Sequence, residues 1–151
     1  MLGINGIALS PDARTLYWTV TTGRHAHAVS TSVLRNPKAK AAEVATAVRN
    51  IGDVGGNTDG IVTRADGQLY TTDVTRNGIV RYNPATKKMT LVAADEGISW
   101  PDTPTIAPDG ALVVTSSRLN QHFAGAVKAG EERYDLWRLP LNTPSKPATS
   151  R

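Results

Sequence analysis

Apolar and polar residues alternate in short runs along this chain, and each run ends in a turn. One order of residues occurs three times, beginning with Asn or Asp and ending in a Pro-Asp or Ala-Asp pair: Asn5–Asp12, Asp59–Asp66 and Asp102–Asp109. A second apolar run follows each turn: Leu16–Thr19, Leu69–Thr72 and Leu112–Thr115. Alternation with a period of two predicts half-buried strands. Repetition at intervals of roughly 40 to 50 residues predicts a repeat array, and short strands with Gly-containing turns favour the blades of a β-propeller.

The second repeat predicts one complete blade of four antiparallel strands. The pairs Asp66-Gly67 and Asn77-Gly78 separate its strands, and such pairs supply the positive φ angles that tight hairpins need. We expect these strands at residues 61–63, 68–73, 79–82 and 89–93. The same pattern predicts strands at 4–9, 15–21 and 25–31 in the first repeat, and at 103–107, 111–116 and 134–139 in the third, with a polar loop at 118–132.

One segment of the first repeat has a different period. Asn36 is a candidate N-cap, Pro37 stands at a first helical position, and the residues up to Asn50 are rich in Ala. The apolar residues that share one face of this helix are Ala41, Val44, Ala45 and Val48. We therefore expect one short amphipathic helix inserted between strands, and this insertion accounts for the greater length of the first repeat.

The size of the chain predicts an incomplete ring. Its 151 residues, 16.1 kDa and 40% hydrophobic content are enough for the core of one domain. We expect a half propeller over residues 1–141, with blades at about 1–57, 58–97 and 98–141, and a disordered tail at 142–151. A blade uses about 40 to 45 residues and closed propellers have about four to eight blades. The chain is therefore either a fragment or self-associates through its open blade edges.

Composition and charge narrow the classes of partner. The formal charge is +4 and the isoelectric point is near 9.6, but the basic residues are scattered and not interleaved with aromatic ones. We therefore expect no nucleic-acid partner. The absence of Cys excludes disulfides and thiolate metal sites. No run of about 18 apolar residues occurs, and the first residues lack a basic segment followed by an apolar one, so we expect no membrane partner and no signal peptide in this chain.

The residues that begin the three repeats are the first candidates for chemistry. The innermost strands of successive propeller blades run beside a central channel, so Asn5, Asp59 and Asp102 are expected to converge there as oxygen ligands. Such ligands suit a hard divalent cation, Ca²⁺ or Mg²⁺. A metal held there could lower the pKa of a bound water, as ester or lactone hydrolysis requires. Asn and Asp are also common turn formers that bond to their own backbone, and that alternative stays open.

Trp100 is a candidate for ligand binding rather than metal binding. It lies two residues before Asp102, near the expected mouth of the channel. An indole in that place can stack on an aromatic or cationic ligand. Trp100, Asp102 and Asn5 are therefore the candidate ligand-binding residues.

The order and spacing of several motifs resemble a known family. The motifs are Gly3–Asp12 followed by Thr15–Trp18, Ser32–Pro37 before the Ala-rich segment, Asp59-Gly60 with Gly67–Tyr70, and Ser99–Thr103 with Thr115–Ser117. Together they resemble the C-terminal half of the major royal jelly protein/yellow family over nearly the whole chain. The resemblance implies an all-β fold, a six-bladed β-propeller of which this chain holds about three blades. Members of that family are usually secreted, and they include small-ligand binders and proteins implicated in melanin-pathway chemistry.

The chain is also similar to the gluconolactonase and senescence-marker propellers, which hold a divalent metal on the axis. By that resemblance Asn5 and Asp59 match two of the metal ligands, and Asp59 also matches the proposed general base. The acidic ligand in the first blade of those lactonases, and another Asn ligand, would lie upstream of Met1.

Three functional hypotheses result. The first is a yellow-like propeller fragment that binds a small aromatic or amine ligand on the axial channel face through Trp100, Asp102, Asn5 and Asp59. The second is a lactone hydrolase that uses Ca²⁺ or another divalent cation, with Asn5 and Asp59 as metal ligands and Asp59 as the catalytic residue. The third is an inactive truncated remnant.

Overall fold

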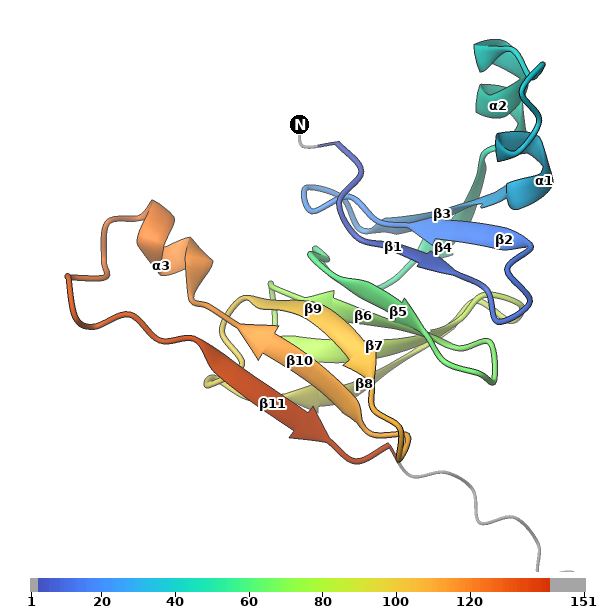
Figure 1. Ribbon diagram of the computed structural model, residues 1–151. Coiled ribbons are helices and arrows are strands. Elements are labelled where there is room, and N and C mark those ends of the chain that lie inside the picture. The colour runs from blue at the N-terminus through green and yellow to red at the C-terminus, as the bar shows by residue number, and fades with distance from the viewer. Residues whose placement is uncertain (1–2, 142–151) are drawn as a thin grey trace, which may run out of the picture.

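Three antiparallel sheets, each made from one continuous stretch of chain, form the molecule (Figure 1). The computed structural model describes residues 3–141. Blade 1 contains β1 (Ile7–Leu9), β2 (Thr15–Trp18), β3 (His25–Ser30) and β4 (Arg49–Asp53). Blade 2 contains β5 (Ile61–Thr63), β6 (Leu69–Asp73), β7 (Gly78–Asn83) and β8 (Lys88–Ala94). Blade 3 contains β9 (Pro101–Ile106), β10 (Leu112–Ser116) and β11 (Asp135–Leu139).

Strands that are consecutive in sequence pair with each other in every blade, which makes each blade a meander. The first strand of each blade is the inner one: β1 lies against β5, and β5 lies against β9. Figure 1 shows β1, β5 and β9 near the middle of the molecule. This arrangement confirms the expected all-β fold, a partial β-propeller.

The hairpins of blade 2 follow from the turn residues in their sequence. Gly67 and Asn77 both have positive φ, at 79° and 50°, in the two hairpins that connect β5 to β6 and β6 to β7. In the next turn the side chain of Asn83 accepts hydrogen bonds from the backbone of Ala85 and Thr86 at 2.9 and 3.0 Å. Local turn chemistry therefore fixes the order of strands in this blade.

The inserted helix expected within residues 36–50 is α2 (Ala41–Ala47), which is shorter than the Ala-rich segment, and a second short helix, α1 (Thr31–Leu34), precedes it. Pro37 does not begin a helix, since the Asn36 side chain accepts from the Lys38 backbone at 3.0 Å and forms a turn. The helix α2 begins only after Lys40, whose backbone N–H donates to the Glu43 carboxylate. A third helix, α3 (Leu119–Phe123), lies within the segment expected to be a loop.

The last part of the expected helix is a strand. Residues 49–53 form β4, which pairs with β3 and completes blade 1. The alternation in β4 is weak because only Ile51 is buried, and Gly52 has a φ of 124°. A bulge between Ala26 and His27 shifts the register of the pairing. The sequence pattern of β4 is therefore too short and irregular to be recognised as a strand.

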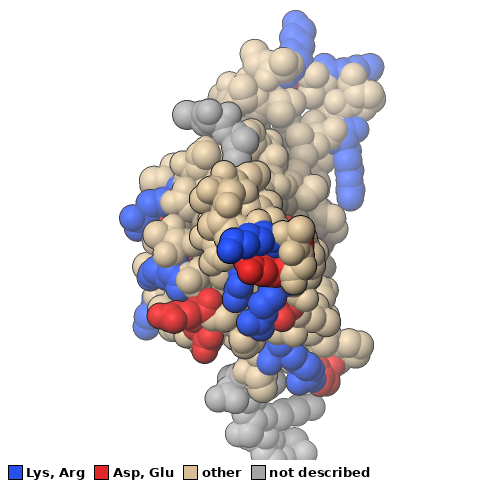
Figure 2. All heavy atoms as spheres, turned by 90° about the vertical axis from the view of Figure 1, so that its left-hand side faces the viewer, with Lys and Arg blue, Asp and Glu red and all other residues tan. Residues whose placement is uncertain are grey.

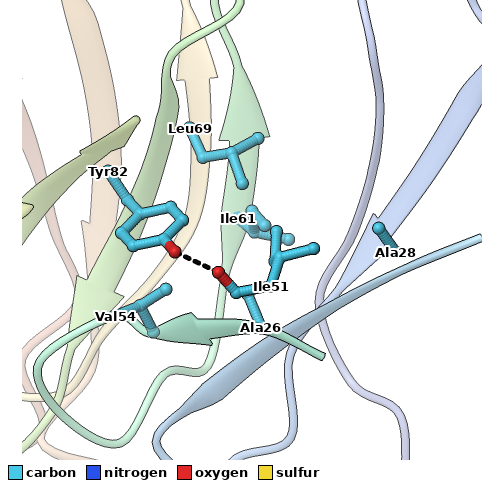
Figure 3. Close-up of a cluster of buried hydrophobic side chains, with 7 residues drawn as sticks. All are labelled: Ala26, Ala28, Ile51, Val54, Ile61, Leu69 and Tyr82. Carbon is cyan, nitrogen blue, oxygen red and sulfur yellow. Dashed lines mark hydrogen bonds between the residues drawn. The ribbon is translucent and has the colours of Figure 1, made fainter. Parts of the chain in front are cut away.

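Apolar side chains fill the spaces between neighbouring blades. The cluster between blades 1 and 2 consists of Ala26, Ala28, Ile51, Val54, Ile61, Leu69 and Tyr82 (Figure 3). Within it the hydroxyl of Tyr82 donates a hydrogen bond to the carbonyl of Ile51, which joins β7 to β4. The cluster between blades 2 and 3 is built on Tyr70, Ile79, Leu112 and Val114. Each blade therefore needs a neighbour to bury its apolar face.

Two blade faces have no neighbour in the described part of the chain. In β1, Ala8 packs on the core while Ile7 and Leu9 point the other way and are 59% and 48% exposed. In β11, Trp137 packs on blade 2 while Leu136 is 72% exposed. These two free faces lie at opposite ends of the row of blades (Figure 1).

The surface in Figure 2 carries basic and acidic side chains side by side in its lower half rather than one continuous basic patch. Among residues 3–141, no helix is long and apolar enough to cross a bilayer. The predicted disordered tail at 142–151 lies outside the described residues.

Candidate functional site

The residues that begin the three repeats meet where the inner strands start. Asn5 precedes β1, Asp59 precedes β5, and Asp102 is the second residue of β9. Side chains and backbone of these segments line one hollow of about 400 Å³, formed by Asn5, Gly6, Ile7, Asp59, Gly60, Ile61, Asp102, Thr103 and Pro104. The fold therefore brings the three predicted residues together on the axial face.

Asp59 is the centre of the hydrogen bonds at this hollow. Its carboxylate is only 9% exposed and accepts bonds from three neutral donors. The indole N–H of Trp100 donates to Oδ2 at 2.6 Å. The side-chain amide of Asn5 and the hydroxyl of Thr21 donate to Oδ1, the hydroxyl at 3.3 Å. Because both carboxylate oxygens accept hydrogen bonds, Asp59 is held in one orientation.

The side-chain amide of Asn5 connects blade 1 to the hydrogen bonds around Asp59. The Asn5 amide also donates to the Thr21 hydroxyl at 2.7 Å, so Thr21 stands between Asn5 and Asp59. Thr21 is buried and follows the end of β2. No repeated position contains Thr21, so the sequence pattern could not single it out.

A second threonine positions the backbone at the start of β5. The hydroxyl of Thr72, in β6, accepts from the backbone N–H of Asp59 at 3.0 Å and of Gly60 at 2.9 Å. Thr115 occupies the corresponding place in β10, and its hydroxyl donates to the carbonyl of Asp102 at 2.9 Å. The sequence pattern could have indicated Thr72 and Thr115, because a Thr ends the second apolar run of every repeat, at Thr19, Thr72 and Thr115.

Two glycines allow the inner strands to approach each other closely. A side chain at Gly60 would collide with Pro104 and would place its Cβ 2.8 Å from the backbone nitrogen of Thr103. A Cβ at Gly6 would lie 3.1 Å from both the Asp59 carbonyl oxygen and the Ile61 nitrogen. The Asn-Gly and Asp-Gly pairs that begin two repeats therefore serve strand packing as well as the site.

The backbone around Trp100 has an unusual conformation. Trp100 has a φ of 51° and Thr103 a φ of 45°, although neither is Gly. Arg118, whose backbone N–H donates to the Ser99 carbonyl at 3.2 Å, has a φ of 52°. Non-Gly residues in this region cost about 1–3 kcal/mol each and persist where the surroundings determine them. This local conformation directs the indole N–H of Trp100 toward the carboxylate of Asp59.

An aromatic side chain from α3 extends the site outward from the axial hollow. The ring of Phe123 lies edge-on to the Trp100 indole, with 6.2 Å between centroids. Phe123 is 76% exposed, and α3 projects from blade 3 beyond the ends of its strands (Figure 1). Sequence reasoning placed this segment in a featureless loop and did not single out Phe123.

Asp102 is the most accessible acid of the site. It is half-buried, and its Oδ1 accepts the backbone N–H of Thr103 at 2.6 Å. Within residues 3–141 neither Asp59 nor Asp102 forms a salt bridge, and no Lys or Arg lines the hollow. Two carboxylates without a basic partner give the hollow a negative potential that attracts cationic groups.

The arrangement does not fit a resident divalent metal. Calcium takes about six to eight oxygen ligands. Trp100 Nε1 can only donate, and its N–H points at the Asp59 oxygen Oδ2, while the side-chain amide of Asn5 donates to Oδ1. Among the described residues, no group of three His, Cys, Asp or Glu side chains is placed to hold a metal ion. The predicted metal ligands Asn5 and Asp59 contact each other directly, with the Asn5 amide donating to the Asp59 carboxylate.

Solved structures with similar folds include several propellers. A gluconolactonase from Xanthomonas campestris is 20% identical, with a TM-score of 0.66 over 91% of this chain and 43% of its own. A putative gluconolactonase is 14% identical, with a TM-score of 0.63 over 91% of this chain and 45% of its own. The calcium-binding protein regucalcin from Agrobacterium tumefaciens is 21% identical, with a TM-score of 0.55 over 90% of this chain and 45% of its own. The chain thus spans less than half the length of these three proteins.

The sequence comparisons identify the family. No curated protein is significantly similar to the chain in sequence. The model of the major royal jelly protein family, however, matches residues 1–148. The resemblance inferred from the repeated motifs is therefore confirmed, and the chain belongs to the major royal jelly protein family.

Proposed function

We propose that this chain binds a small organic ligand with a protonated amine on its axial face. One observation carries the proposal: a hollow of about 400 Å³ contains two carboxylates, Asp59 and Asp102, and among the described residues no basic side chain lines it. Burial of negative charge without a cation is unfavourable, so a cationic ligand would stabilise the site.

The residues of the site have different roles in this proposal. Asp102 is half-buried, and within residues 3–141 no donor contacts its Oδ2, so it pairs with the ammonium group. Asn5 directs its amide N–H at Asp59 and offers its carbonyl oxygen as an acceptor. Trp100 and Phe123 present aromatic surface at the edge of the site, which suits an aromatic ring or a cation.

The geometry favours binding over lactone hydrolysis. A general base needs a carboxylate oxygen within reach of the proton that it removes. Both oxygens of Asp59 accept protein hydrogen bonds, from Trp100 on one side and from Asn5 on the other. The similar gluconolactonases share the fold at 14% and 20% identity, which supports no assignment of their activity to this chain.

The proposal is tested by titrating the chain with 2-phenylethylamine and measuring binding by isothermal titration calorimetry. The neutral 2-phenylethanol and the anionic 3-phenylpropionate serve as ligands of similar size. We expect the amine alone to bind. The variant Asp102→Asn should weaken its binding at least about tenfold, because a hydrogen bond to a charged group contributes about 1.5–3 kcal/mol.

Asp109→Asn is the matched control, since it removes the same charge from an exposed turn of blade 3, where Asp109 pairs with Arg138. The affinity of Asp109→Asn for 2-phenylethylamine should equal that of the wild type.

The proposal is contradicted if 2-phenylethylamine, 2-phenylethanol and 3-phenylpropionate bind equally well. It is also contradicted if Asp102→Asn and Asp109→Asn change the affinity for 2-phenylethylamine by the same factor. Lactone hydrolysis that depends on Ca²⁺ and is lost in Asp59→Asn would replace it with the hydrolase hypothesis.

A further inference from the structure

The carboxylate of Asp59 is buried without a basic side chain beside it in the described part of the chain. It is 9% exposed and forms no salt bridge among the described residues. A buried carboxylate needs compensation, which ordinarily comes from a basic side chain or a metal. Here the compensation comes from the N–H and O–H dipoles of Trp100, Asn5 and Thr21.

The Trp100 bond is the decisive one because an indole nitrogen cannot reverse its role. A hydroxyl or an amide can turn an oxygen toward an ion, and the side chains of Thr21 and Asn5 have that freedom. The N–H of Trp100 points at Asp59 Oδ2 from 2.6 Å and can only donate. A divalent cation at this oxygen would meet the positive end of the N–H dipole.

We propose that Trp100 is a specificity-determining residue that excludes divalent cations from the axial site. Its N–H donates to Asp59 Oδ2, so a cation that bound both oxygens of this carboxylate would lie against the positive end of the N–H dipole. The site then recognises ligands by hydrogen bonds and charge alone. This inference does not depend on which small molecule binds.

Three features keep Trp100 in place against competition from an ion. The positive φ of Trp100, 51°, sets the direction of its side chain. The carbonyl of Ser99 accepts hydrogen bonds from the backbone N–H groups of Ser117 and Arg118, both at 3.2 Å. These bonds connect the segment before β9 to the residues that follow β10. Phe123 contacts the indole from outside. Displacing Trp100 would therefore disturb β9, β10 and α3 together.

The test is a calorimetric titration with CaCl₂ of the wild type and of the variants Trp100→Phe and Trp137→Phe. Phe keeps an aromatic ring against Phe123 but lacks the N–H. Trp137 is the matched control, because its N–H donates to Ser116 at 3.0 Å between blades 2 and 3, away from Asp59. We expect detectable binding by Trp100→Phe alone, with the affinities of the wild type and of Trp137→Phe at least about tenfold lower and below detection; tenfold is about 1.4 kcal/mol.

The double variant Trp100→Phe with Asp59→Asn should lose the gained affinity, since the freed oxygen is then gone. The inference is overturned if the wild type binds Ca²⁺ and Asp59→Asn abolishes that binding, or if Trp100→Phe binds no better than the wild type. Binding of 2-phenylethylamine is measured separately, so failure of one proposal is distinguishable from failure of the other.

A second measurement needs no substitution at Trp100. The indole N–H signals are recorded by proton–nitrogen NMR, and that of Trp100 is assigned by elimination with Trp18→Phe and Trp137→Phe. We expect this signal to exchange slowly and to keep its position when CaCl₂ is added. A shift or loss of the signal on addition of CaCl₂ would contradict the inference.

Discussion

At the scale of single residues, Tyr82 is the ionisable group whose environment most clearly affects stability. Its side chain is fully buried between blades 1 and 2, and its hydroxyl donates to the carbonyl of Ile51. Burial raises the pKa of Tyr82 above the ordinary 10.0, and the negative charge of Asp53 adds to the shift. The folded state therefore keeps this proton at a pH where the unfolded chain loses it.

This shift predicts a pH-dependent contribution to stability. Below pH 10.0 both states keep the proton and the contribution is fully present, whereas above it the unfolded state ionises first and the free energy of unfolding falls. Tyr82→Phe should be about 1 kcal/mol less stable than the wild type at neutral pH. Denaturant unfolding between about pH 8 and about pH 11 should show this difference shrinking as pH rises. A difference that stays constant would refute the assignment.

Individual residues also show how far the sequence could define the site. The repeat placed Asn5, Asp59 and Asp102 at equivalent positions, and these lie around one hollow because equivalent positions of successive blades share the axis. Thr21 could not be found in this way, since its role depends on where the end of β2 points. The hydrogen bond between Trp100 and Asp59 was equally hidden, because it spans 41 residues and depends on a positive φ at a non-Gly residue.

At the scale of elements, the close approach of β5 and β9 depends on Gly60. An added methyl group would collide with Pro104 of β9, which cannot yield without moving the backbone of that strand. We expect Gly60→Ala to lower the free energy of unfolding by about 1–3 kcal/mol, as overpacking does. Gly3→Ala is the control, because no atom lies within 4 Å of its added Cβ, and it should change stability by less than about 0.5 kcal/mol. Equal stability of the two variants in urea would show that the strands can separate freely.

Elements with local signals were predictable, and those that depend on tertiary contacts were not. The strands of blade 2 followed from the turns at Gly67 and Asn77. The strand β4 did not, because its pairing with β3 is interrupted by a bulge and its sequence continues an Ala-rich segment. The bounds of α2 were missed because the Asn36 side chain and Glu43 place the turn and the helix start several residues later than Pro37 suggested.

At the scale of the whole molecule, the meander topology explains why the fold class was predictable while the assembly was not. Every blade pairs only strands that are neighbours in sequence, so local patterns determine it. Hairpin sequences do not determine which surface packs against the free faces of blades 1 and 3, because that contact does not involve strands that are neighbours in sequence. Two apolar clusters show that each internal face is buried by the next blade. The outer faces expose Ile7, Leu9 and Leu136 instead.

These exposed faces predict self-association of the chain as a head-to-tail pair. The free face of blade 1 and that of blade 3 lie at opposite ends of the row, so two copies can cover both faces at once. The occupant that we propose is therefore a second copy of this chain. Its contacts would repeat the blade-to-blade packing already present within one copy, with apolar side chains on both surfaces.

Sedimentation velocity over a range of protein concentrations measures this association directly. Leu136→Lys should weaken it at least about tenfold, because it places a charge on an apolar surface that must be buried. Leu91→Lys is the control: Leu91 is 44% exposed, but it lies in β8, the outer strand of the middle blade, away from both free faces. A chain that remains monomeric at every concentration would rule out the pair, and an equal effect of the two variants would place the contact elsewhere. Association that is weakened in Leu136→Lys and unchanged in Leu91→Lys would support the proposed pair, with the free face of blade 3 as one of its surfaces.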